Sequence, residues 1–340
     1  MSDTITYPWE GKKNGFQDSL HYLKGRKEGL IKSLRTPWVK FNDATTDGLE
    51  WHSMTVIGGR PGAGKTLMKD QIIREAFTLN HGDNFRVLEF SFEMLQRVSA
   101  IREYSSHLGK SYKHLCSADG KLSEEDLLKC FAYAKTRVKY PIDVVEEPCT
   151  VLEFKDIIAR YMETHIIKMI EVEVEKNGVK EKQMVPLYAN TIVTLDHSLL
   201  MQKSSFERDK MEMLYNLGEA ITDIKRKYPI AFIILSQLNR NIDKPERSED
   251  RKYGNYVLES DIMGADALLQ HADTVIGLNR PGKQRIRFYG PDGFIIEDDR
   301  VLVMHFLKCR NGDNRMSFFN AEFERMTITE AEAPPTSSRK

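Results

Sequence analysis

The sequence predicts an α/β protein built on one mostly parallel, twisted sheet with helices on both faces. Strand-like segments rich in apolar and β-branched residues alternate with segments whose apolar residues recur at helical spacing, which is the pattern of a sheet with crossover helices. Several strand-like segments are apolar without interruption, as expected for strands buried on both faces. The 340 residues are enough for one large α/β core with extensions, or for two small domains.

The first predicted element precedes the core. Residues 1–15 are polar and are expected to be loosely ordered. Over residues 16–34 the apolar side chains fall close to helical spacing, and Gly25 is a weak point in the pattern. We predict one amphipathic helix here, whose apolar stripe needs a surface on its own domain or on a neighbouring subunit. Together these segments form an expected N-terminal extension over residues 1–35.

The core is predicted to span residues 36–328. We expect its strands at residues 54–58, 86–92, 142–145, 191–195, 230–235, 274–278 and 301–307. We expect its helices at residues 65–78, 94–107, 124–138, 151–165, 207–227 and 260–271.

Two inserts interrupt this alternation. Residues 168–187 alternate apolar and charged side chains around Asn177-Gly178, which is a strong hairpin signal. Residues 281–300 contain Pro-Gly, Gly-Pro and Asp-Gly turns and suggest a second hairpin. The tail at residues 329–340 is predicted to be disordered because it is polar and contains two prolines.

Composition narrows the classes of function. With 50 basic and 50 acidic residues the formal net charge is zero, so composition gives no support for DNA binding, although a ring can concentrate basic groups in a central channel. The four cysteines form no CxxC pair, which argues against a zinc site or a disulfide framework. No apolar run reaches the ~18 residues of a membrane span, and the N-terminus lacks the apolar core of a secretion signal. We therefore expect a cytoplasmic protein without a membrane partner.

One motif carries clear chemistry. Residues 59–66, GRPGAGKT, match the phosphate-binding pattern G-x-x-x-x-G-K-[ST], after a strand-like segment and at the start of a predicted helix. Glycines let backbone N–H groups turn toward phosphates, and the helix N-terminus adds a positive dipole end. Lys65 is expected to neutralise the β- and γ-phosphates of ATP, and the Thr66 hydroxyl to ligate Mg²⁺. A chance glycine turn is the alternative. The predicted nucleotide-binding residues are Gly59, Arg60, Pro61, Gly62, Ala63, Gly64, Lys65, Thr66 and Leu67.

Hydrolysis also needs a metal-directed carboxylate and a base. Asp196 ends the strand TIVTLD and suits the metal role, although a strand-end aspartate can also cap a helix or turn. Glu93 ends another hydrophobic strand and is the candidate base; it can equally begin the next helix, and Glu89 competes with it from within the strand. Gln237 ends a third strand and could sense the γ-phosphate, but such a motif alone is more often an ordinary polar strand end.

Taken together, these motifs resemble the C-terminal ATPase domain of the DnaB family of replicative helicases, a RecA-like P-loop NTPase. GGRPGAGKT looks like the family's ARPxxGKT, FSFEM like its FSLEM and ILSQLNR like its ALSQLNR. SDIMGADALLQHAD is similar to the family's helix that begins with serine-aspartate and ends with alanine-aspartate, and LKCRNGDN resembles its KxRNG. The motifs occur in family order over residues 36–328, which is far more specific than the phosphate-binding loop alone.

The resemblance implies roles for particular residues. Glu93 would be the catalytic base and Asp196 would direct Mg²⁺. Gln237 would link the state of the γ-phosphate to the DNA-facing loops. Arg310 would reach the adjacent subunit's nucleotide as an arginine finger, with Lys308 as its companion. Without the resemblance, a solvated strand end is the favoured interpretation of these two cations.

The chain also departs from the family. The family's N-terminal helical domain, which contacts primase, is expected to be missing, and the predicted helix at residues 16–34 resembles the family's linker helix, which packs on the neighbouring subunit. His197 stands where the family usually has a tyrosine, and we interpret it as a strand-end packing residue. Met263 and Gly264 replace an arginine-glutamate pair in the DNA-facing loop, so backbone contacts to phosphate would survive but a cationic contact would not.

Other cations could compensate near this loop. Arg240 and Lys244 are further tentative DNA-binding residues, together with Met263 and Gly264. Within residues 244–252, basic side chains alternate with acidic ones. A solvated loop is therefore as good an interpretation of this segment as a DNA-binding one.

The resemblance implies a hexameric, ATP-driven DNA helicase that translocates on single-stranded DNA, 5′→3′ by analogy, in the replication of a phage or mobile element. Its partners would be single-stranded DNA and other copies of the chain in a ring, and could include a primase, a helicase loader and a polymerase. If the chain is phage-encoded, it would act in the host cytoplasm. The alternative is a RecA-like ATPase that forms rings or filaments in recombination or regulation without unwinding DNA. A small-molecule kinase would need a lid with acceptor-binding arginines, and none is apparent in the sequence.

Overall fold

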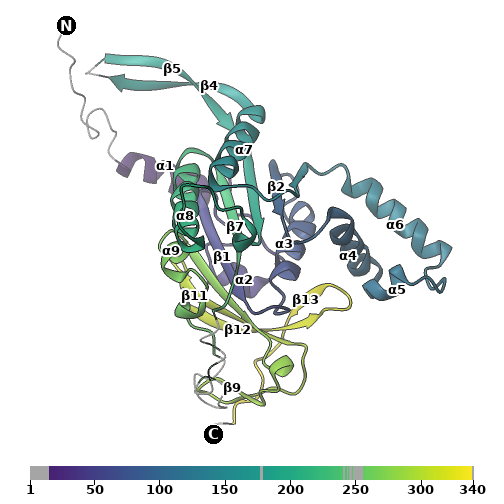
Figure 1. Cartoon of the computed structure of the whole chain (residues 1–340). Helices are drawn as coiled ribbons and strands as arrows, with labels where there is room; N and C mark the ends of the chain where they lie inside the picture. The colour runs from purple at the N-terminus through teal and green to yellow at the C-terminus, as the bar shows by residue number, and fades with distance from the viewer. Residues whose placement is uncertain are drawn as a thin grey trace.

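The computed structural model describes residues 15–176, 179–239, 242, 244, 247 and 256–338. A large sheet occupies the centre of the molecule, with strands in the order β13-β12-β11-β8-β1-β7-β6-β2-β3 (Figure 1). Its inner six strands, from β8 to β3, pair in parallel, whereas β11, β12 and β13 add an antiparallel edge. The predicted α/β class with a mostly parallel sheet is confirmed.

All seven predicted core strands are present, with ends that differ by at most two residues. The parallel strands are β1 (Ser53–Gly59), β2 (Phe85–Ser91), β3 (Ile142–Val145), β6 (Asn190–Asp196), β7 (Ile230–Gln237) and β8 (Thr274–Asn279). The antiparallel edge consists of β11 (Val301–Cys309), β12 (Arg315–Glu322) and β13 (Thr327–Glu330). The last two strands were not predicted, since β12 mixes polar and apolar side chains and β13 has four residues.

Most predicted helices are also present. They are α3 (Lys65–Leu79), α4 (Gln96–Leu108), α6 (Glu124–Arg137), α7 (Val151–Thr164) and α8 (Lys210–Lys227). Two short helices, α2 (Val39–Ala44) and α5 (Tyr112–Cys116), were not predicted. Capping boxes at Ser123 and Thr150 fix the starts of α6 and α7, because the cap and the third helical residue satisfy each other's backbone N–H groups.

The prediction of a helix over residues 260–271 was wrong in extent. A single 3₁₀ turn at Glu259–Asp261 comes first, Ile262 then pairs with Leu238 in extended conformation, and only Ala265–Leu269 forms helix α9. Gly264 separates the two segments with a φ of 70°, a left-handed conformation that interrupts a right-handed helix.

The predicted helix over residues 16–34 is shorter than expected. Helix α1 spans Gly15–Lys27, and Gly29 follows with a φ of 70°, a left-handed backbone typical of a helix end. Leu34 instead forms a β-bridge with Leu49. The apolar residues Phe16, Leu20 and Leu23 of α1 are 78%, 66% and 60% exposed, so this chain alone leaves most of the stripe uncovered.

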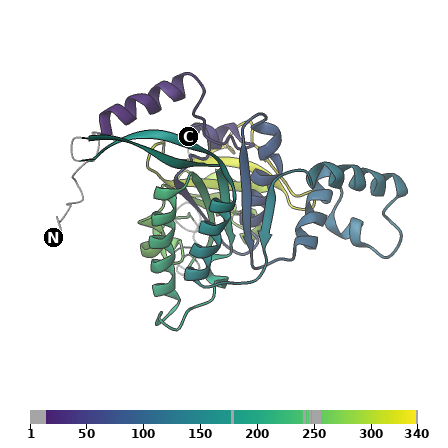
Figure 2. The same cartoon turned by 90° about the horizontal axis from the view of Figure 1, so that it is seen from above.

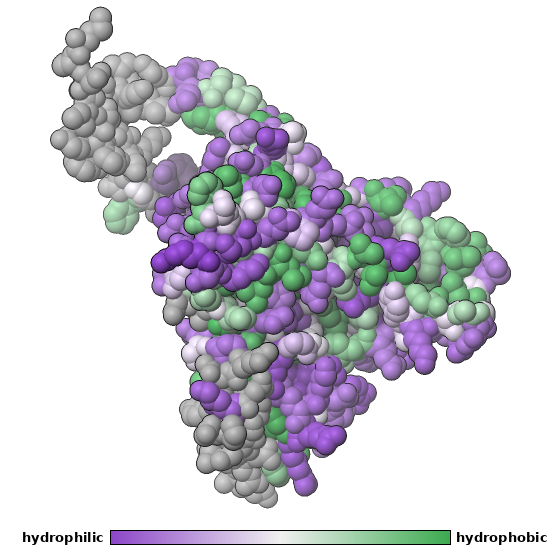
Figure 3. Space-filling view, viewed as in Figure 1, coloured by the Kyte–Doolittle hydropathy of each residue, from purple (hydrophilic) through white to green (hydrophobic). Residues whose placement is uncertain are grey.

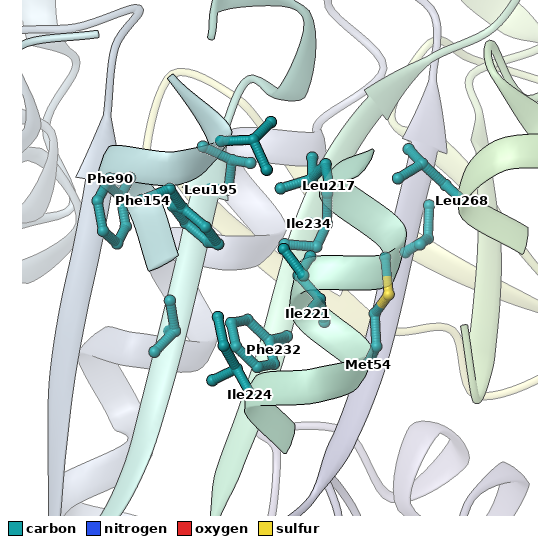
Figure 4. Close-up of a cluster of buried hydrophobic side chains, with 14 of the residues drawn as sticks. Met54, Phe90, Phe154, Leu195, Leu217, Ile221, Ile224, Phe232, Ile234 and Leu268 are labelled. Carbon is teal, nitrogen blue, oxygen red and sulfur yellow. The ribbon is translucent and has the colours of Figure 1, made fainter. Parts of the chain in front are cut away.

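Two apolar clusters hold the layers together, one on each face of the sheet. Strand β7 shows why its sequence is apolar without interruption: Phe232 and Ile234 join the cluster under α7 and α8, and Ile233 joins the cluster under α3. Figure 4 shows the first cluster, where Ile221 of α8 packs over β7. Seen from above, α7 and α8, drawn teal to green, lie on the same side of the sheet (Figure 2).

Three segments extend away from this core. Helices α4, α5 and α6 form a lobe at one side (Figures 1 and 2), and hydrophobic side chains gather on its surface (Figure 3). The first predicted hairpin is confirmed by the antiparallel strands β4 (Ile166–Lys176) and β5 (Val179–Tyr188), which project beyond the sheet; Asn177 and Gly178 themselves lie outside the described residues. The second is reduced to β9 (Phe288–Tyr289) and β10 (Phe294–Ile295).

The expectation of a disordered tail needs correction for its described part. Within residues 329–338, β13 ends at Glu330, the Ile295 N–H donates to the carbonyl of Thr336 at 2.9 Å, and the Ser337 hydroxyl donates to the carbonyl of Asp292 at 2.7 Å. The tail therefore packs against the second hairpin. In the described part of the chain, no helix combines the length and the apolar character that a membrane crossing requires.

Candidate nucleotide-binding site

The phosphate-binding loop connects the central strand β1 to helix α3. Gly62 and Gly64 have φ values of 73° and 103°, a region that side chains disfavour, so both positions need glycine. Gly59 is tightly surrounded as well: a Cβ there would lie 3.2 Å from the carbonyl oxygen of Leu278 on β8. The glycines of the motif thus let the loop fold back closely over the end of the sheet.

Lys65 points back across this loop. Its Nζ donates to the carbonyl oxygens of Gly59 at 2.8 Å and Arg60 at 3.3 Å. Burial lowers the pKa of Lys65, and the nearby charges of Asp196 and Glu93 oppose that effect. An ammonium group has three donors, so one remains for a phosphate oxygen after the two loop carbonyls.

A cavity of about 300 Å³ lies beside the loop. Its lining contains the predicted residues Lys65, Thr66, Glu93 and Gln237. They come together because the strands are parallel: Gly59 is paired with Gln237, and the carboxyl ends of such strands meet at one edge of the sheet. Their roles remain predictions, but the structure does bring them together.

Asp196 lies at the same edge, next to Ser91 in register, and is 2% exposed. Burial raises its pKa, whereas the charge of Lys69 and a hydrogen bond from the Thr66 side chain lower it. Its Oδ1 has no hydrogen-bond partner among the described residues. This buried, unpartnered carboxylate oxygen beside a hydroxyl fits Mg²⁺, which binds one or two protein oxygens together with phosphates and water.

The structure places the two candidate glutamates differently. Glu93 lines the cavity and precedes α4, which begins at Gln96, so it is not part of the helix. Glu89 forms an ion pair with the buried Lys69, at 3.0 Å between Oε2 and Nζ, and does not line the cavity. Position therefore favours Glu93 as the base and gives Glu89 a structural role.

His197, which we interpreted as a strand-end packing residue, also lies at the cavity. It is 4% exposed and lines the cavity. Burial and the charge of Lys65 lower its pKa to about 4. The Leu199 N–H donates to its Nδ1 at 3.3 Å, and its Nε2 has no hydrogen-bond partner among the described residues.

Sequence reasoning missed further lining residues, and three of them come from segments outside the quoted motifs. Arg102 comes from α4, and Phe323 and Met326 come from the turn between β12 and β13. Arg280 after β8 stacks on the Phe323 ring at 3.7 Å from its centroid and donates to the Gly62 carbonyl at 3.2 Å. No motif marks these residues, because the fold brings them from distant segments to one cavity.

Lys308 and Arg310 are not among the residues that line this cavity. In register, Lys308 is paired with Val275, near the amino end of β8, whereas the loop follows the carboxyl end of β1 at the level of Leu278. At ~3.3 Å per residue the two levels are roughly 10 Å apart along the strands. Lys308 donates to the carbonyl of Leu269, and Arg310 donates to that of Gln270 at 2.9 Å.

One of the predicted DNA-facing residues, Met263, is hydrogen-bonded to Gln237. The Met263 N–H donates to the Gln237 carbonyl at 2.7 Å, and the Met263 side chain is 38% exposed. Gly264 is buried, and a Cβ there would lie 2.6 Å from Leu214 Cδ1, so its contribution is backbone geometry. Lys244 is exposed, and Arg240 lies outside the described residues.

The basic residues near this loop differ in whether their side chains could contact DNA. Arg247 forms an ion pair with Asp261 at 2.8 Å, which is 1% exposed, so this cation holds the loop together. Arg251 and Lys252 lie outside the described residues.

Comparison with known proteins agrees with this geometry. A family model described as the DnaB-like helicase C terminal domain matches residues 34–326. A probable replicative DNA helicase of Trieres chinensis is 24% identical over 277 residues, covering 79% of this chain and 51% of that protein. A replicative DNA helicase DnaB of Helicobacter pylori is 26% identical over 259 residues, covering 75% and 45%. The chain thus spans about half the length of the curated relatives it matches.

Two solved structures share the fold. One is a DnaB-like replicative helicase, described with its interactions with primase, and the other is a single ATPase domain. Each has a TM-score of 0.72 and 15% identity and covers 94% of this chain; this chain covers 68% of the first and 100% of the second. The RecA-like ATPase fold predicted for the core is confirmed.

Proposed function

The chain belongs to the DnaB-like helicase C-terminal domain family, and from this premise we propose that it hydrolyses ATP to move along single-stranded DNA and unwind duplex DNA. The observation that supports this most directly is the cavity where Lys65, Thr66, Glu93 and Gln237 meet beside Asp196. A phosphate cradle alone binds nucleotide, whereas a carboxylate opposite the cradle can also activate water.

Each residue of the cavity has a separate role in the proposed hydrolysis of ATP. Lys65 and the loop N–H groups hold the β- and γ-phosphates, while Thr66 and Asp196 would hold Mg²⁺, which offsets phosphate charge when bound. Glu93 accepts a proton from the attacking water. Phe323 and Met326 line the same cavity and offer an apolar surface for the base of the nucleotide.

Gln237 provides a physical connection from nucleotide to DNA. Its side chain lines the cavity, and its backbone carbonyl accepts from Met263 in the DNA-facing loop. A change in how Gln237 contacts the terminal phosphate therefore displaces a hydrogen-bonded neighbour in that loop. We propose that this contact converts hydrolysis into movement along the phosphate backbone, 5′→3′ by family analogy.

We further propose that the working form is a hexameric ring. The exposed stripe of α1 and the exposed face of α6, with Leu128 66% and Phe131 64% exposed, lie on opposite sides of the molecule (Figure 1). Two different apolar surfaces on opposite sides suit a head-to-tail contact, which closes a ring when the rotation allows. In such a ring Arg310 and Lys308, remote from their own cavity, can serve a neighbour's.

The biological setting follows by analogy alone. Replication of a phage or mobile-element genome in the host cytoplasm, with a primase, a loader and a polymerase as partners, is our proposal for it. The primase is suggested by the interactions of one structural neighbour.

The first test is ATP hydrolysis and strand displacement on a forked DNA with Mg²⁺. Wild-type protein is expected to do both, with hydrolysis stimulated by single-stranded DNA. Lys65→Ala should lower hydrolysis at least about a hundredfold, since it removes the cation that faces the phosphates. Normal turnover in this variant would refute the assignment of the cavity.

A second candidate function is a ring- or filament-forming ATPase that does not unwind DNA. The zero net charge and the lack of a cationic side chain at Met263 and Gly264 favour it. DNA-stimulated hydrolysis without strand displacement, from every forked substrate tried, would select this function over the helicase.

A further inference from the structure

His197 carries an inference that rests on the proposed function and goes beyond it. We propose that the Nε2–H group of His197 donates a hydrogen bond to an oxygen of the terminal phosphate of bound ATP, so that this side chain distinguishes ATP from ADP.

The first observation is a buried nitrogen without a partner at the cavity. His197 is 4% exposed, yet it lines the cavity together with Lys65, Glu93 and Gln237. Its Nε2 makes no hydrogen bond to any described residue. Buried polar groups are almost always hydrogen-bonded, so such an atom indicates a ligand that completes the site.

The second observation assigns the proton. The Leu199 N–H donates to Nδ1 at 3.3 Å, so Nδ1 is an acceptor. A neutral imidazole carries one proton, which therefore resides on Nε2 and makes this atom a donor. The contact with Leu199 fixes the ring as well as its tautomer, because it ties the side chain to the turn that follows β6.

The third observation identifies an acceptor of the right chemistry. Lys65 is held over the loop beside His197, and its charge acts on the His197 ring. Because both residues line one cavity, an anion bound by Lys65 would share that cavity with Nε2. Phosphate oxygens accept hydrogen bonds, which complements an N–H donor. Glu93 and Gln237, the residues expected near the terminal phosphate, share the lining with His197, so we assign the contact to that phosphate.

The surroundings support a ligand over simple packing. Thr194, Asp196 and Ser198, the close neighbours of His197, also have buried side-chain oxygens without a hydrogen-bond partner among the described residues. Four such residues within five positions of one strand end are unusual in a folded interior.

Two substitutions at His197 distinguish the effect of the Nε2–H donor from the effect of losing the imidazole ring. His197→Asn retains an acceptor near the Nδ1 position and lacks the distal N–H. His197→Gln retains an N–H near the position of Nε2. Affinities for ADP and for a non-hydrolysable triphosphate analogue with an imido bridge are measured by calorimetry with Mg²⁺. We expect His197→Asn to weaken the analogue roughly tenfold and ADP less than twofold, and His197→Gln to stay within about threefold of wild type.

The outcomes are distinct. Equal losses for both nucleotides, or equal behaviour of the two variants, would assign His197 a packing role and overturn the proposal. If the variants do not fold, ¹⁵N-histidine spectra of the wild-type protein test the same contact: the Nε2–H signal should shift with the triphosphate analogue and not with ADP, and identical spectra would refute it. Discrimination between nucleotides without ATP hydrolysis would sustain this inference while refuting the proposed function.

Discussion

Lys69 shows how single residues hold the charges near the cavity in place. It lies one turn after Thr66 in α3, its side chain is 2% exposed, and its Nζ contacts Asp70 at 2.9 Å and Glu89 at 3.0 Å. These carboxylates raise its pKa, so it stays charged despite its burial, and its charge in turn favours the ionised form of Asp196. The burial of Lys69, which the sequence did not reveal, therefore places a charge that favours the ionised form of Asp196, the proposed ligand of Mg²⁺.

The residues of the site illustrate what the sequence can predict. The loop, Asp196 and Gln237 stand at strand ends, and parallel strands bring their ends together by topology. The choice between Glu89 and Glu93 was different, since both have the same chemistry and lie four positions apart. The resemblance assigned the base to Glu93, and the surroundings of each residue now give a physical reason: an ion pair for Glu89 and the cavity for Glu93. The cavity position of His197 was missed for a related reason: an unpartnered nitrogen is visible only in three dimensions.

The burial of His305 should make the free energy of unfolding depend on pH. It is buried, lies 2.6 Å from the Tyr289 hydroxyl, and burial lowers its pKa to about 3. Its unfolded pKa is ~6.5, so below that pH the unfolded state binds more protons than the folded state. The contribution of His305 to the free energy of unfolding is fully present above pH 6.5 and is lost progressively as the pH falls toward 3.

Urea unfolding at two pH values measures this effect. Between pH 7 and pH 5 the free energy of unfolding should fall by about 2 kcal/mol because of His305. His305→Gln should show a smaller difference between the two pH values, by the same amount. An identical pH dependence in both proteins would contradict the assignment.

At the scale of elements, prediction succeeded where one physical cause dominated. Strands buried on both faces are apolar without interruption, as in β7, and helices with one buried stripe keep their period, as in α8. Prediction failed where the backbone conformation of a glycine determined the end of a helix. Gly264 and Gly29 both adopt left-handed conformations that end or shorten a helical pattern, and periodicity of side chains carries no information on φ.

Replacement of Gly264 by alanine should lower the stability of the protein. Alanine there would adopt a disfavoured φ of 70° and would place its Cβ 2.6 Å from Leu214 Cδ1. Strain and overpacking together should lower the free energy of unfolding by roughly 3 kcal/mol. Gly29→Ala is a matched control, because Gly29 has the same φ and a Cβ there would meet no heavy atom within 4 Å.

For the control, strain alone should cost about 1 kcal/mol. Both values follow from urea titrations of the purified variants. Equal losses for Gly264→Ala and Gly29→Ala would show that the contact with Leu214 contributes nothing.

At the scale of the whole molecule, the two cations Lys308 and Arg310 do not line the cavity of their own chain. This separation is explained if neighbouring copies share each site. The sequence could indicate the two cations by resemblance, but their distance from the cavity depends on the antiparallel direction of β11, which follows from the folded sheet.

Arg310→Ala should preserve nucleotide affinity and lower ATP turnover by about a thousandfold, since the cation is expected to stabilise the charge of phosphoryl transfer at a neighbour's site. Mixing this variant with Lys65→Ala should restore part of the activity, because some sites then combine an intact loop with an intact arginine. Arg160→Ala, which removes an exposed arginine on α7, is the control and should keep wild-type turnover.

Rescue that is absent at every mixing ratio, in particles of wild-type mass, would refute a shared site. A fully active monomer in the presence of nucleotide and DNA would refute the ring as well.

Helix α9 has five residues, and both of its ends are engaged. On one side, Met263 is hydrogen-bonded to Gln237; on the other, the carbonyls of Leu269 and Gln270 hold Lys308 and Arg310. Because the segment is short and helical, we expect a displacement at one end to move the other end as well. If neighbouring copies share each site as proposed, we expect the loss of one terminal phosphate to change the position of Lys308 and Arg310 at the next subunit, so that the copies hydrolyse ATP in sequence around the ring.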